Sequence, residues 1–473
     1  MGNDSRVFRP NQIQYTMTKE QKKAVGILSL GTILEYFDLM LYVHMAVVLN
    51  DLFFPKTDPH TAKLLAGFTF CSTYVFRPFG ALFFGWLGDK VGRRYTIILT
   101  TAMMAVACII MAKCETYAEI GISASIIMIG CRVLQGLASM GEVVGALLYL
   151  TESIERPVRY FAVGLIESFC NVGCVLALVC ANLSIGYMND WRIAFYIGAT
   201  LAIISIVVRV ALRETPEFLD ASKKLQEIKE IVGDLSADNK HFLSEQFSVS
   251  HKKSYYALFC LECVWPLAFY FIYVFCADLL KNQFGYTNEQ IINHNLILTI
   301  ILLLTTSLNS ILYMFFHPMI IFKYRFILSL GVFCAISFCL NNISSSFDVM
   351  VIQTLILLFS PYSLKGMAST IYTHFPVLKR FRAASIIYAA SRAATYVVTT
   401  FGFIYLVQWL GNLGIFLAFV FTSLCTWYGF NHFWKLEKVT GDLEKFARIQ
   451  KVAKDRLDTT RSCTIAYPHT EIV

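Results

Sequence analysis

The sequence has few charged residues. Charged side chains make up only 15% of the 473 residues, whereas 56% are hydrophobic and the mean hydropathy is +0.58. A soluble globular chain normally carries about 25% charged residues. This scarcity of charge excludes an ordinary soluble domain and indicates a chain that lies mostly in lipid or in packed protein.

Features typical of several other protein classes are also missing. The 14 cysteines are scattered, mostly within apolar stretches, and show no zinc-type spacing with histidine. We therefore expect reduced thiols and no metal site. The first 23 residues contain no short apolar stretch followed by a small-residue cleavage site, so no removable signal peptide is expected. We find no phosphate loop or nucleophile elbow, and predict neither an enzyme nor a cofactor.

Long apolar stretches occupy most of the chain. Only a helix satisfies its own backbone polar groups within a bilayer, and it needs roughly 20 apolar residues to cross. The sequence predicts an all-α membrane protein with about twelve transmembrane helices. The predicted spans are 24–50, 62–88, 94–113, 119–150, 160–183, 192–212, 255–280, 291–316, 326–343, 349–373, 384–408 and 413–434.

The basic residues predict the orientation. The formal net charge is +8, which by itself would suit a nucleic-acid partner. However, about 30 of the 40 Lys and Arg residues fall on the side that holds both termini, as the positive-inside rule describes. We predict a multi-pass protein of the plasma (inner) membrane with both termini cytoplasmic. The bilayer is its partner, and no nucleic acid is expected.

The longest polar interruption divides the predicted spans into six and six. A cytoplasmic linker at 214–254 separates predicted bundles at 24–213 and 255–434. Transporter halves commonly arise as repeats with the substrate site between them. A cytoplasmic segment at 1–23 precedes the bundles, and a cytoplasmic tail at 435–473 follows them.

The tail has two interpretations. A coiled coil would make it a dimerisation element, whereas an amphipathic helix on the bundle or the headgroups would leave a monomer. We favour the amphipathic helix. The apolar residues near heptad positions a and d are Leu436, Val439, Leu443, Phe446, Ala453 and Leu457.

A glycine-rich turn ends the second predicted span. It reads Gly85-Trp86-Leu87-Gly88-Asp89-Lys90-Val91-Gly92-Arg93-Arg94. Glycines allow close backbone approach, and an acid there can pair with a base on a neighbouring helix. The turn resembles the signature of the major facilitator superfamily, Gly-x-Leu-x-Asp-x-x-Gly-Arg-Arg/Lys. The resemblance implies the major facilitator fold and a cytoplasmic gate formed by Gly85, Asp89, Gly92, Arg93 and Arg94.

Further motifs are similar to the metabolite:proton symporter family. They include Glu35-Tyr36-Phe37-Asp38, Arg77-Pro78-Phe79-Gly80 and Arg213-Glu214-Thr215-Pro216-Glu217-Phe218. Members of that family take up proline and betaine, 2-oxoglutarate, citrate or shikimate. The resemblance implies proton-driven uptake of a small molecule. The chain departs from the pattern at Met140, where a second glycine is usual, and at 316–326, where the gate turn is not repeated.

Acidic residues within the spans supply the predicted coupling site. An ionisable group in a span is costly unless it faces a polar cavity or a partner. Glu35 and Asp38 lie one turn apart on the first helix. Two carboxylates that close would repel each other, which favours a proton on one of them near neutral pH. We predict Asp38, with Glu35 and Glu142, as proton-coupling residues; structural pairing with Arg77 or Arg132 is the alternative.

Arginine and aromatic residues supply the predicted substrate site. An Arg fork matches a carboxylate, and an aromatic ring attracts a cation. The expected ligand is a small carboxylated or zwitterionic metabolite near the bilayer midplane. An aromatic packing stripe with a snorkelling Arg is the alternative on the eleventh helix. The predicted substrate residues are Tyr42, Arg77, Arg132, Gln135, Tyr388, Arg392 and Tyr396, whereas Glu167, Glu262 and Lys365 are interpreted as interfacial.

The functional prediction depends on one geometric condition. The acids and arginines of the amino-terminal helices must point together into one wet central chamber. The predicted function is secondary active transport by alternating access, with a small molecule and a proton as ligands; sodium is not distinguished from the proton. The alternatives are a sugar carrier of the same superfamily, a degenerate carrier acting as a receptor or sensor, and a membrane-embedded enzyme.

Overall fold

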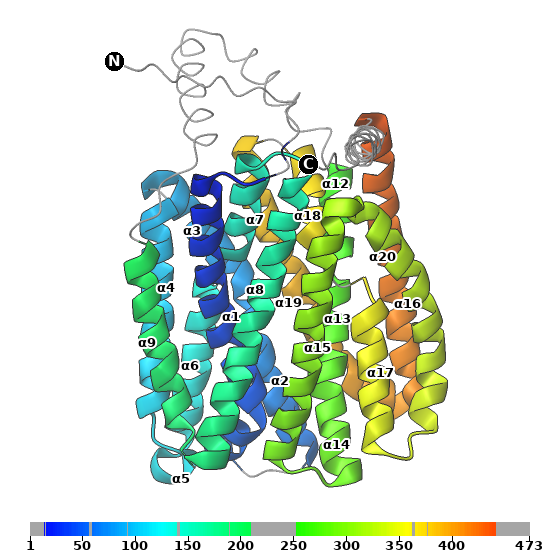
Figure 1. Ribbon diagram of the computed structural model, residues 1–473. Coiled ribbons are helices and arrows are strands. Elements are labelled where there is room, and N and C mark those ends of the chain that lie inside the picture. The colour runs from blue at the N-terminus through cyan, green and yellow to red at the C-terminus, as the bar shows by residue number, and fades with distance from the viewer. Residues whose placement is uncertain are drawn as a thin grey trace, which may run out of the picture.

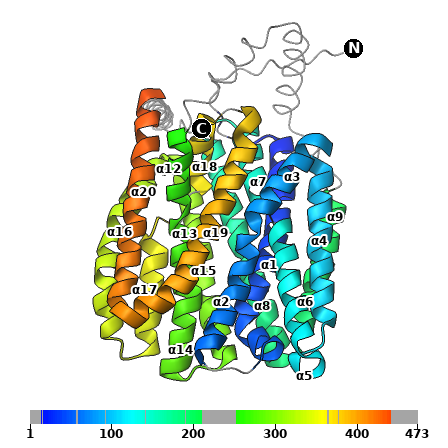
Figure 2. The same cartoon turned by 180° about the vertical axis from the view of Figure 1, so that it is seen from behind.

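The computed structural model describes residues 14, 16–55, 59–91, 93–139, 142–188, 190–209, 252–361, 365–375 and 377–440. Long helices run side by side and form one bundle (Figure 1, Figure 2). Within the described residues there is no β-strand, only an isolated bridge between Gln14 and Pro157. The predicted linker at 214–254 and the tail beyond Thr440 lie almost wholly outside the described residues.

The helices fall into two consecutive sets. The first comprises α1 (Lys19–Phe53), α2 (Pro59–Val75), α3 (Arg77–Val91), α4 (Arg93–Lys113), α5 (Tyr117–Ile120), α6 (Ile122–Ala138), α7 (Glu142–Ser153), α8 (Val158–Asn182) and α9 (Arg192–Arg209). The second comprises α12 (Lys252–Glu262), α13 (Val264–Phe269), the π-helical turn η2 (Tyr270–Phe275), α14 (Cys276–Phe284), α15 (Asn288–Phe315), α16 (Pro318–Asn341), α17 (Ser346–Phe359), α18 (Lys365–Ile371), α19 (Val377–Leu410) and α20 (Asn412–Thr440).

Many of these helices are suited to a membrane. Eight helical stretches in the described part of the chain are long and apolar enough to cross a bilayer, and three shorter apolar helices accompany them. The all-helical prediction is confirmed for the described residues. The prediction of twelve spans is not confirmed, because fewer stretches meet the length and hydropathy that a crossing requires.

Prolines interrupt two of the long helical runs. Pro266 has no N–H to donate to the carbonyl of Glu262, four residues earlier, and α12 ends at Glu262. Pro361 likewise frees the carbonyl of Leu357, and α17 ends just before this proline. The freed carbonyl accepts a hydrogen bond from Arg325 Nη2 at 3.2 Å. The first break lies beside Trp265, which lines the central cavity described below.

Glycines set the closest helix contacts of the first half. A Cβ on Gly136 of α6 would lie 2.1 Å from the carbonyl oxygen of Thr73 on α2. A Cβ on Gly173 of α8 would lie 2.3 Å from the carbonyl oxygen of Ile33 on α1. Real Cβ atoms do not approach carbonyl oxygens so closely, so only glycine permits these helices to pack at these distances.

The two halves pack along two main interfaces. Helix α8 lies against α15, and α2 and α3 lie against α19 (Figure 2). In the first interface Asn171 Nδ2 donates to Thr306 Oγ1 at 3.0 Å. At the end where α1 begins, the buried side chains of Arg380 and Glu152 form an ion pair of 3.1 Å between the halves. The halves therefore touch along the bundle and enclose its centre.

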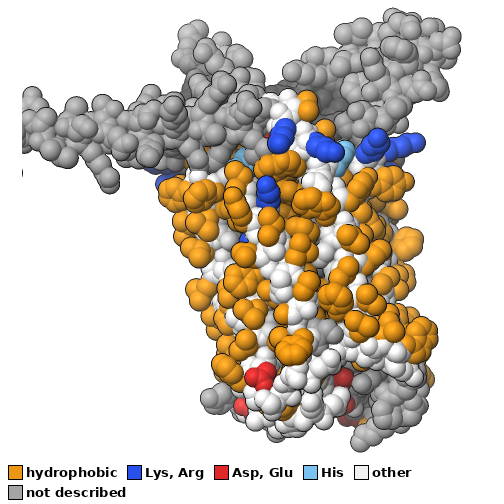
Figure 3. Space-filling model, turned by 90° about the vertical axis from the view of Figure 1, so that its right-hand side faces the viewer, with side chains coloured by type: hydrophobic (Ala, Val, Ile, Leu, Met, Phe, Trp, Pro, Cys, Tyr) orange, Lys and Arg blue, Asp and Glu red, His pale blue; other side chains and the backbone are white. Residues whose placement is uncertain are grey.

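The charged side chains of the surface are distributed unequally between the two ends. Helix α1 begins and α20 ends at the same end of the bundle, here named the terminal end (Figure 1). On the face in Figure 3, a broad hydrophobic band separates Lys and Arg at the terminal end from Asp and Glu at the opposite end. This distribution matches the asymmetry on which the predicted orientation depends.

The cysteines of the described residues are free thiols, and most are buried. They include Cys260 and Cys263, a Cys-x-x-Cys spacing within and just after α12. Cys263 Sγ donates to the carbonyl of Phe259 at 3.2 Å, as a packed helical thiol does. Among the described side chains no group of three or more His, Cys, Asp and Glu residues is suited to a metal.

Candidate functional site

A cavity lies between the halves, and both contribute to its wall. We name it the central chamber. The empty space among its side chains, counted with its opening, is about 500 Å³. The first half supplies Tyr36, Leu39, Met40, His44, Tyr74, Arg77, Asn171 and Cys174, and the second half supplies Trp265, Phe269, Tyr273, Thr299, Leu302, Tyr388, Arg392 and Tyr396.

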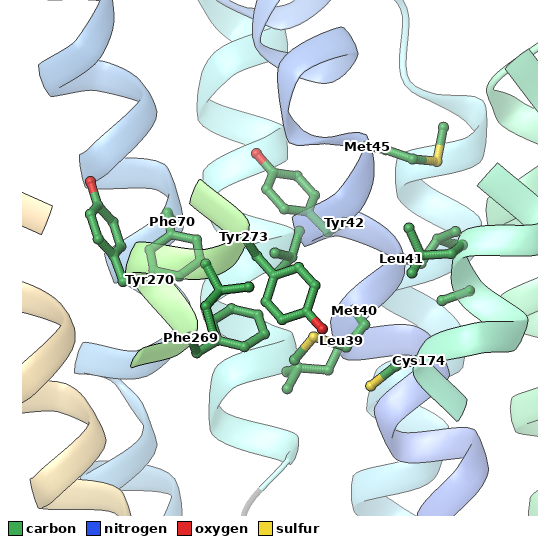
Figure 4. Packing of buried hydrophobic residues seen from close by; sticks show 14 of the residues in the cluster. Leu39, Met40, Leu41, Tyr42, Met45, Phe70, Cys174, Phe269, Tyr270 and Tyr273 are labelled. Carbon is green, nitrogen blue, oxygen red and sulfur yellow. The ribbon is translucent and has the colours of Figure 1, made fainter. Parts of the chain in front are cut away.

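Aromatic rings form much of this wall. Figure 4 shows Phe269 and Tyr273 facing Leu39 and Met40 of α1, whereas Tyr42 points away from them. Across the halves, the rings of Tyr74 and Tyr396 are 4.0 Å apart between centroids. Such rings supply apolar surface and electron-rich faces that attract cations. The wall is therefore suited to a compact organic ligand with a cationic group.

Arg77 is the exceptional residue of the central chamber. It begins α3, where the helix dipole adds to its positive charge. Its side chain is only 3% exposed, and its guanidinium carbon lies 4.6 Å from the ring centroid of Tyr74. Its Nε and Nη2 atoms are buried and have no hydrogen-bond partner among the described residues. A carboxylate would supply both the missing charge and the missing acceptors.

Arg392, in contrast, is already neutralised. Its Nη1 lies 2.7 Å from Glu262 Oε2, and both side chains are buried. Its guanidinium carbon also lies 3.5 Å from the ring centroid of Tyr388. The prediction that Glu262 is interfacial is wrong, because α12 ends at this residue and places it in the wall of a second chamber, described next.

A second chamber adjoins the first on the side of the terminal end, and we name it the terminal chamber. Lys365 lies in its wall and donates to Tyr36 Oη at 3.3 Å and to Cys170 Sγ at 2.9 Å. The interfacial interpretation of Lys365 and Glu167 is thus wrong as well. The lining residues are Tyr36, Leu147, Glu167, Asn171, Glu262, Trp265, Leu302, Lys365, Ala368, Tyr372, Tyr388 and Arg392.

The predicted coupling acids lie elsewhere. Glu35 and Asp38 line a separate small cavity inside the first half, between α1, α4, α6 and α9. The prediction that they share one central chamber with the arginines is therefore wrong. Tyr36 and Met40 of α1 face the central chamber instead, and successive helical residues point about 100° apart. Helix α9 approaches closely, since a Cβ on Gly198 would lie 2.9 Å from Asp38 Oδ1.

Three predicted substrate residues lie behind the chamber wall. Arg132 is fully buried, donates to Gln135 Oε1 at 2.9 Å and stacks on Tyr42, with 3.9 Å from its guanidinium carbon to the ring centroid. Gln135 Nε2 lies 3.7 Å from Cys108 Sγ, which lies 3.7 Å from Asp38 Oδ1. Tyr42, Arg132 and Gln135 line neither chamber. Contacts through Cys108, Gln135 and Arg132 thus link the small cavity of Asp38 to Tyr42, which lies behind the wall of the central chamber.

The other predicted substrate residues do line the central chamber. They are Arg77, Tyr388, Arg392 and Tyr396. The sequence prediction missed the α1 stripe of Tyr36, Met40 and His44, spaced four residues apart, which was readable as a helical face. It also missed Glu262 and Lys365, whose signal was the proline close to each of them in the sequence.

The predicted cytoplasmic gate lies largely outside the described side chains. Gly85 is buried, and α3 continues to Val91 and packs against α19. The structure does not describe Gly92, nor the side chains of Asp89, Arg93, Arg94 and the predicted coupling residue Glu142. Their roles remain predictions.

Comparisons with known proteins agree with this architecture. Residues 28–412 match the Major Facilitator Superfamily. The chain is 30% identical over 278 residues to the proline/betaine transporter of Salmonella typhimurium, covering 57% of this chain and 55% of that protein. It is 32% identical over 268 residues to the inner membrane metabolite transport protein YhjE of Escherichia coli, covering 54% and 60%. The chain thus matches somewhat more than half of the length of each.

A solved structure shares the fold. The proton:xylose symporter XylE bound to 6-bromo-6-deoxy-D-glucose superposes with a TM-score of 0.70, covering 88% of this chain and 95% of that one. The sequence identity is 14%, so this likeness concerns the fold alone.

Proposed function

Because the chain belongs to the major facilitator superfamily, a family of membrane transporters rather than enzymes, we propose that it carries a small zwitterionic or carboxylated metabolite across the membrane. Transport would be secondary active symport with protons, and the substrate would occupy the central chamber. Relatives named as proline/betaine transporters support this substrate class.

Arg77 is the observation that carries the proposal. An arginine that is 3% exposed and has two guanidinium nitrogens without a partner is costly in a low-dielectric interior. A substrate carboxylate would offset this cost with a bidentate, charge-assisted contact. The rings of Tyr74 and Tyr396 would then surround the apolar or cationic part of the same molecule.

Alternating access fits the contacts between the halves. The substrate would reach the chamber when the two sets of helices rock apart at one end and close at the other. The buried pair Arg380 and Glu152 would hold the terminal end shut in the present arrangement. We propose that the terminal end faces the cytoplasm, since Lys and Arg side chains gather there on the face in Figure 3.

We propose that Asp38 binds the coupling proton, with Glu35 and Glu142 as the further candidates. Asp38 lies in its own cavity, so its protonation would act on the substrate site indirectly. The contacts from Asp38 through Cys108 and Gln135 reach Arg132, which stacks on Tyr42 of the same α1 helix. A proton at Asp38 would thereby influence how α1 and α6 pack behind the chamber.

The test is ligand binding and uptake by the purified full chain. Thermal shift and proteoliposome uptake would be measured with proline, glycine betaine, a dicarboxylate and xylose. We expect proline or betaine to stabilise the protein and to be accumulated. We expect Arg77→Gln to weaken ligand affinity by about 10- to 100-fold, because a hydrogen bond to a buried charged group contributes about that much to binding.

A matched control is available for this substitution. Arg192 also begins a helix and also lies 4.6 Å from an aromatic ring centroid, that of Trp191, but it lines neither chamber. Arg192→Gln should leave ligand affinity unchanged. If xylose alone stabilises the protein and is taken up, the proposed substrate class is rejected. If none of the four compounds is taken up, the proposed carrier function is rejected.

A further inference from the structure

Three aromatic residues spaced four apart in the second half line the central chamber. They are Trp265, Phe269 and Tyr273. In an α-helix successive residues turn by about 100°, so each step of four residues advances the side chain by about 40°. Two such steps would carry Tyr273 about 80° round the helix from Trp265. A regular α-helix would thus turn Tyr273 away from the face that Trp265 occupies.

The π-helical turn η2 corrects this drift. The N–H of Cys276 donates to the carbonyl of Phe271, five residues earlier. Hydrogen bonds that span five residues instead of four put more residues in each turn, so each residue rotates by less than it does in an α-helix. Tyr273 is thereby brought back toward the face of Trp265. The shape of this one turn decides whether Tyr273 belongs to the chamber wall.

A buried glutamine on α17 supports this turn. Where five-residue hydrogen bonds give way to the four-residue bonds of α14, the regular ladder of the helix is interrupted. Ile272 lies at this change, directly after Phe271, and its carbonyl accepts a hydrogen bond from Gln353 Nε2 at 2.7 Å. Because Gln353 is fully buried, little solvent competes for this hydrogen bond.

His294 of α15 fixes the orientation of that amide. A carbonyl can only accept, so Gln353 turns its NH₂ group toward Ile272 and its oxygen toward the histidine. His294 Nε2 lies 2.7 Å from Gln353 Oε1 and is therefore the donor. Both residues are buried, but neither lines a chamber. They can act on the central chamber only through the residues that they hold.

The hydroxyl of Tyr273 is held as well. Thr299 Oγ1 donates its one hydrogen to the carbonyl of Asn295 at 2.8 Å. Tyr273 Oη, 3.2 Å from Thr299 Oγ1, is therefore the donor in that contact. The ring centroid of Tyr273 lies 5.0 Å from that of Phe269 and 5.7 Å from that of His44 of the first half (Figure 4). Tyr273 thus has one set position in the wall.

From these contacts we propose that Gln353, oriented by His294, is a positioning residue of the substrate site. By holding the π-helical turn it keeps Tyr273 in the wall of the central chamber, and so it sets the affinity for a substrate that it does not touch. Without its hydrogen bonds the turn would relax toward an α-helix and rotate Tyr273 away. This inference rests on the proposed carrier function and adds residues that act from behind the chamber wall.

Gln353→Leu tests the support of the turn. Leucine is of similar size but makes neither hydrogen bond. We expect the affinity for proline or betaine, measured by titration calorimetry on the purified full chain, to fall by about five- to tenfold, as the loss of one aromatic contact implies. The maximal uptake rate in proteoliposomes should stay within about twofold of the wild type, because a binding contact is lost. Wild-type affinity in this variant would overturn the positioning role.

Tyr273→Ala shows whether the effect passes through the turn. This variant removes the ring and should weaken the affinity at least as much as Gln353→Leu does. Adding Gln353→Leu to Tyr273→Ala should then weaken the affinity by no more than about twofold further, because residues that act through one another are not additive. Losses that multiply would overturn the proposal, since Gln353 would then act on the site by another route.

Substitutions of His294 test the orienting contact. His294→Gln keeps an N–H donor toward Gln353 and should restore an affinity close to that of the wild type. His294→Leu has no donor and should weaken the affinity in the same direction as Gln353→Leu. Equal affinities of the two His294 variants would show that the hydrogen bond to Gln353 has no part in positioning.

Arg325→Met is the matched control. Arg325 Nη2 also donates to a helix carbonyl beside a break, that of Leu357 at 3.2 Å, but neither residue lines a chamber. Arg325→Met should lower the melting temperature and leave the affinity unchanged. Equal losses of affinity in Arg325→Met and Gln353→Leu would overturn the proposal, because a general loosening of the helices would then explain both.

Two further measurements keep these outcomes distinct. If Gln353→Leu is not monodisperse in gel filtration, His294→Leu, which removes only one of the hydrogen bonds, provides the same comparison. If the wild-type protein neither binds nor transports any of the compounds, the proposed function and the positioning role fail together. Normal wild-type binding and transport with unaffected Gln353 and His294 variants removes the positioning role alone.

Discussion

At the scale of single residues, the position of each acid decides its use. Glu262 lies beside the chambers and neutralises Arg392 at 2.7 Å. Asp38 lies in a separate cavity, 3.7 Å from the thiol of Cys108. The surroundings of these two acids differ: Glu262 has a fixed base as its partner, whereas Asp38 lies beside hydroxyls and a thiol in its cavity.

Asp38→Asn tests the coupling assignment. Asparagine keeps the shape of the side chain but cannot bind and release a proton. We expect proteoliposomes with an inward proton gradient to show no accumulation above the external substrate concentration, while substrate exchange across the membrane continues. Radiolabelled uptake with and without the gradient makes this measurement. Accumulation at the wild-type level would reject Asp38 as the proton carrier.

Glu262→Gln tests the buried ion pair. Removing one partner leaves the Arg392 charge uncompensated, which typically costs about 3–5 kcal/mol of stability. We expect a clear fall in the melting temperature of the detergent-solubilised protein. The double variant Glu262→Leu with Arg392→Leu should melt higher than Glu262→Gln, since neither charge remains. Glu289→Gln, at an exposed position, serves as the control.

At the scale of helices, two kinds of residue shape the site. Prolines end α12 and α17 where a continuous helix would otherwise pass the chambers. Glycines let α6 approach α2 and α8 approach α1 within distances that exclude a Cβ atom. The breaks place Glu262 and Lys365 beside the chambers, and the close contacts hold the first half together behind Arg77.

Gly136→Ala tests the close contact between α6 and α2. The added Cβ would lie 2.1 Å from the backbone oxygen of Thr73, so the two helices must separate. We expect a loss of about 1–3 kcal/mol, the usual cost of overpacking, observed as a lower melting temperature. Gly130→Ala on the same helix meets nothing within 4 Å and should melt like the wild type or slightly higher. Equal melting of the two variants would contradict the close packing.

At the scale of the whole molecule, the contacts between the halves determine which end is closed. Arg380 and Glu152 pair at 3.1 Å at the terminal end, and 228 residues separate them in the chain. Because both side chains are buried, the loss of either one leaves the other as an uncompensated charge in the closed arrangement of the pair. Its loss should favour opening of the terminal end.

Glu152→Gln tests this closure. We expect alkylation of Cys174, which lines the central chamber, to become several-fold faster as the chamber opens. Mass spectrometry of the Cys174 peptide after timed exposure to a small maleimide gives the rate. Glu155→Gln is the control, because Glu155 pairs with Arg159 within one half at 3.5 Å. Equal alkylation rates in the two variants would show that the buried pair does not hold the end closed.

The sequence by itself determined the class of this protein. Scarce charge and long apolar stretches predicted an all-helical membrane protein, and the glycine-rich turn at Gly85 predicted the superfamily. These properties are local, since hydropathy sums over neighbouring residues and a motif is read from consecutive ones. The same local reading named Arg77 and Tyr388, which line the central chamber.

Only the tertiary structure decided which side chains meet. Glu35 and Tyr36 are consecutive residues, yet one faces a cavity inside the first half and the other faces the chambers. Glu262 and Arg392 pair across 130 residues of sequence. A helical pattern specifies which residues share a face but not toward which neighbour that face is turned. That rotation is set by packing against helices distant in the chain, and so the site became visible only once those helices were in place.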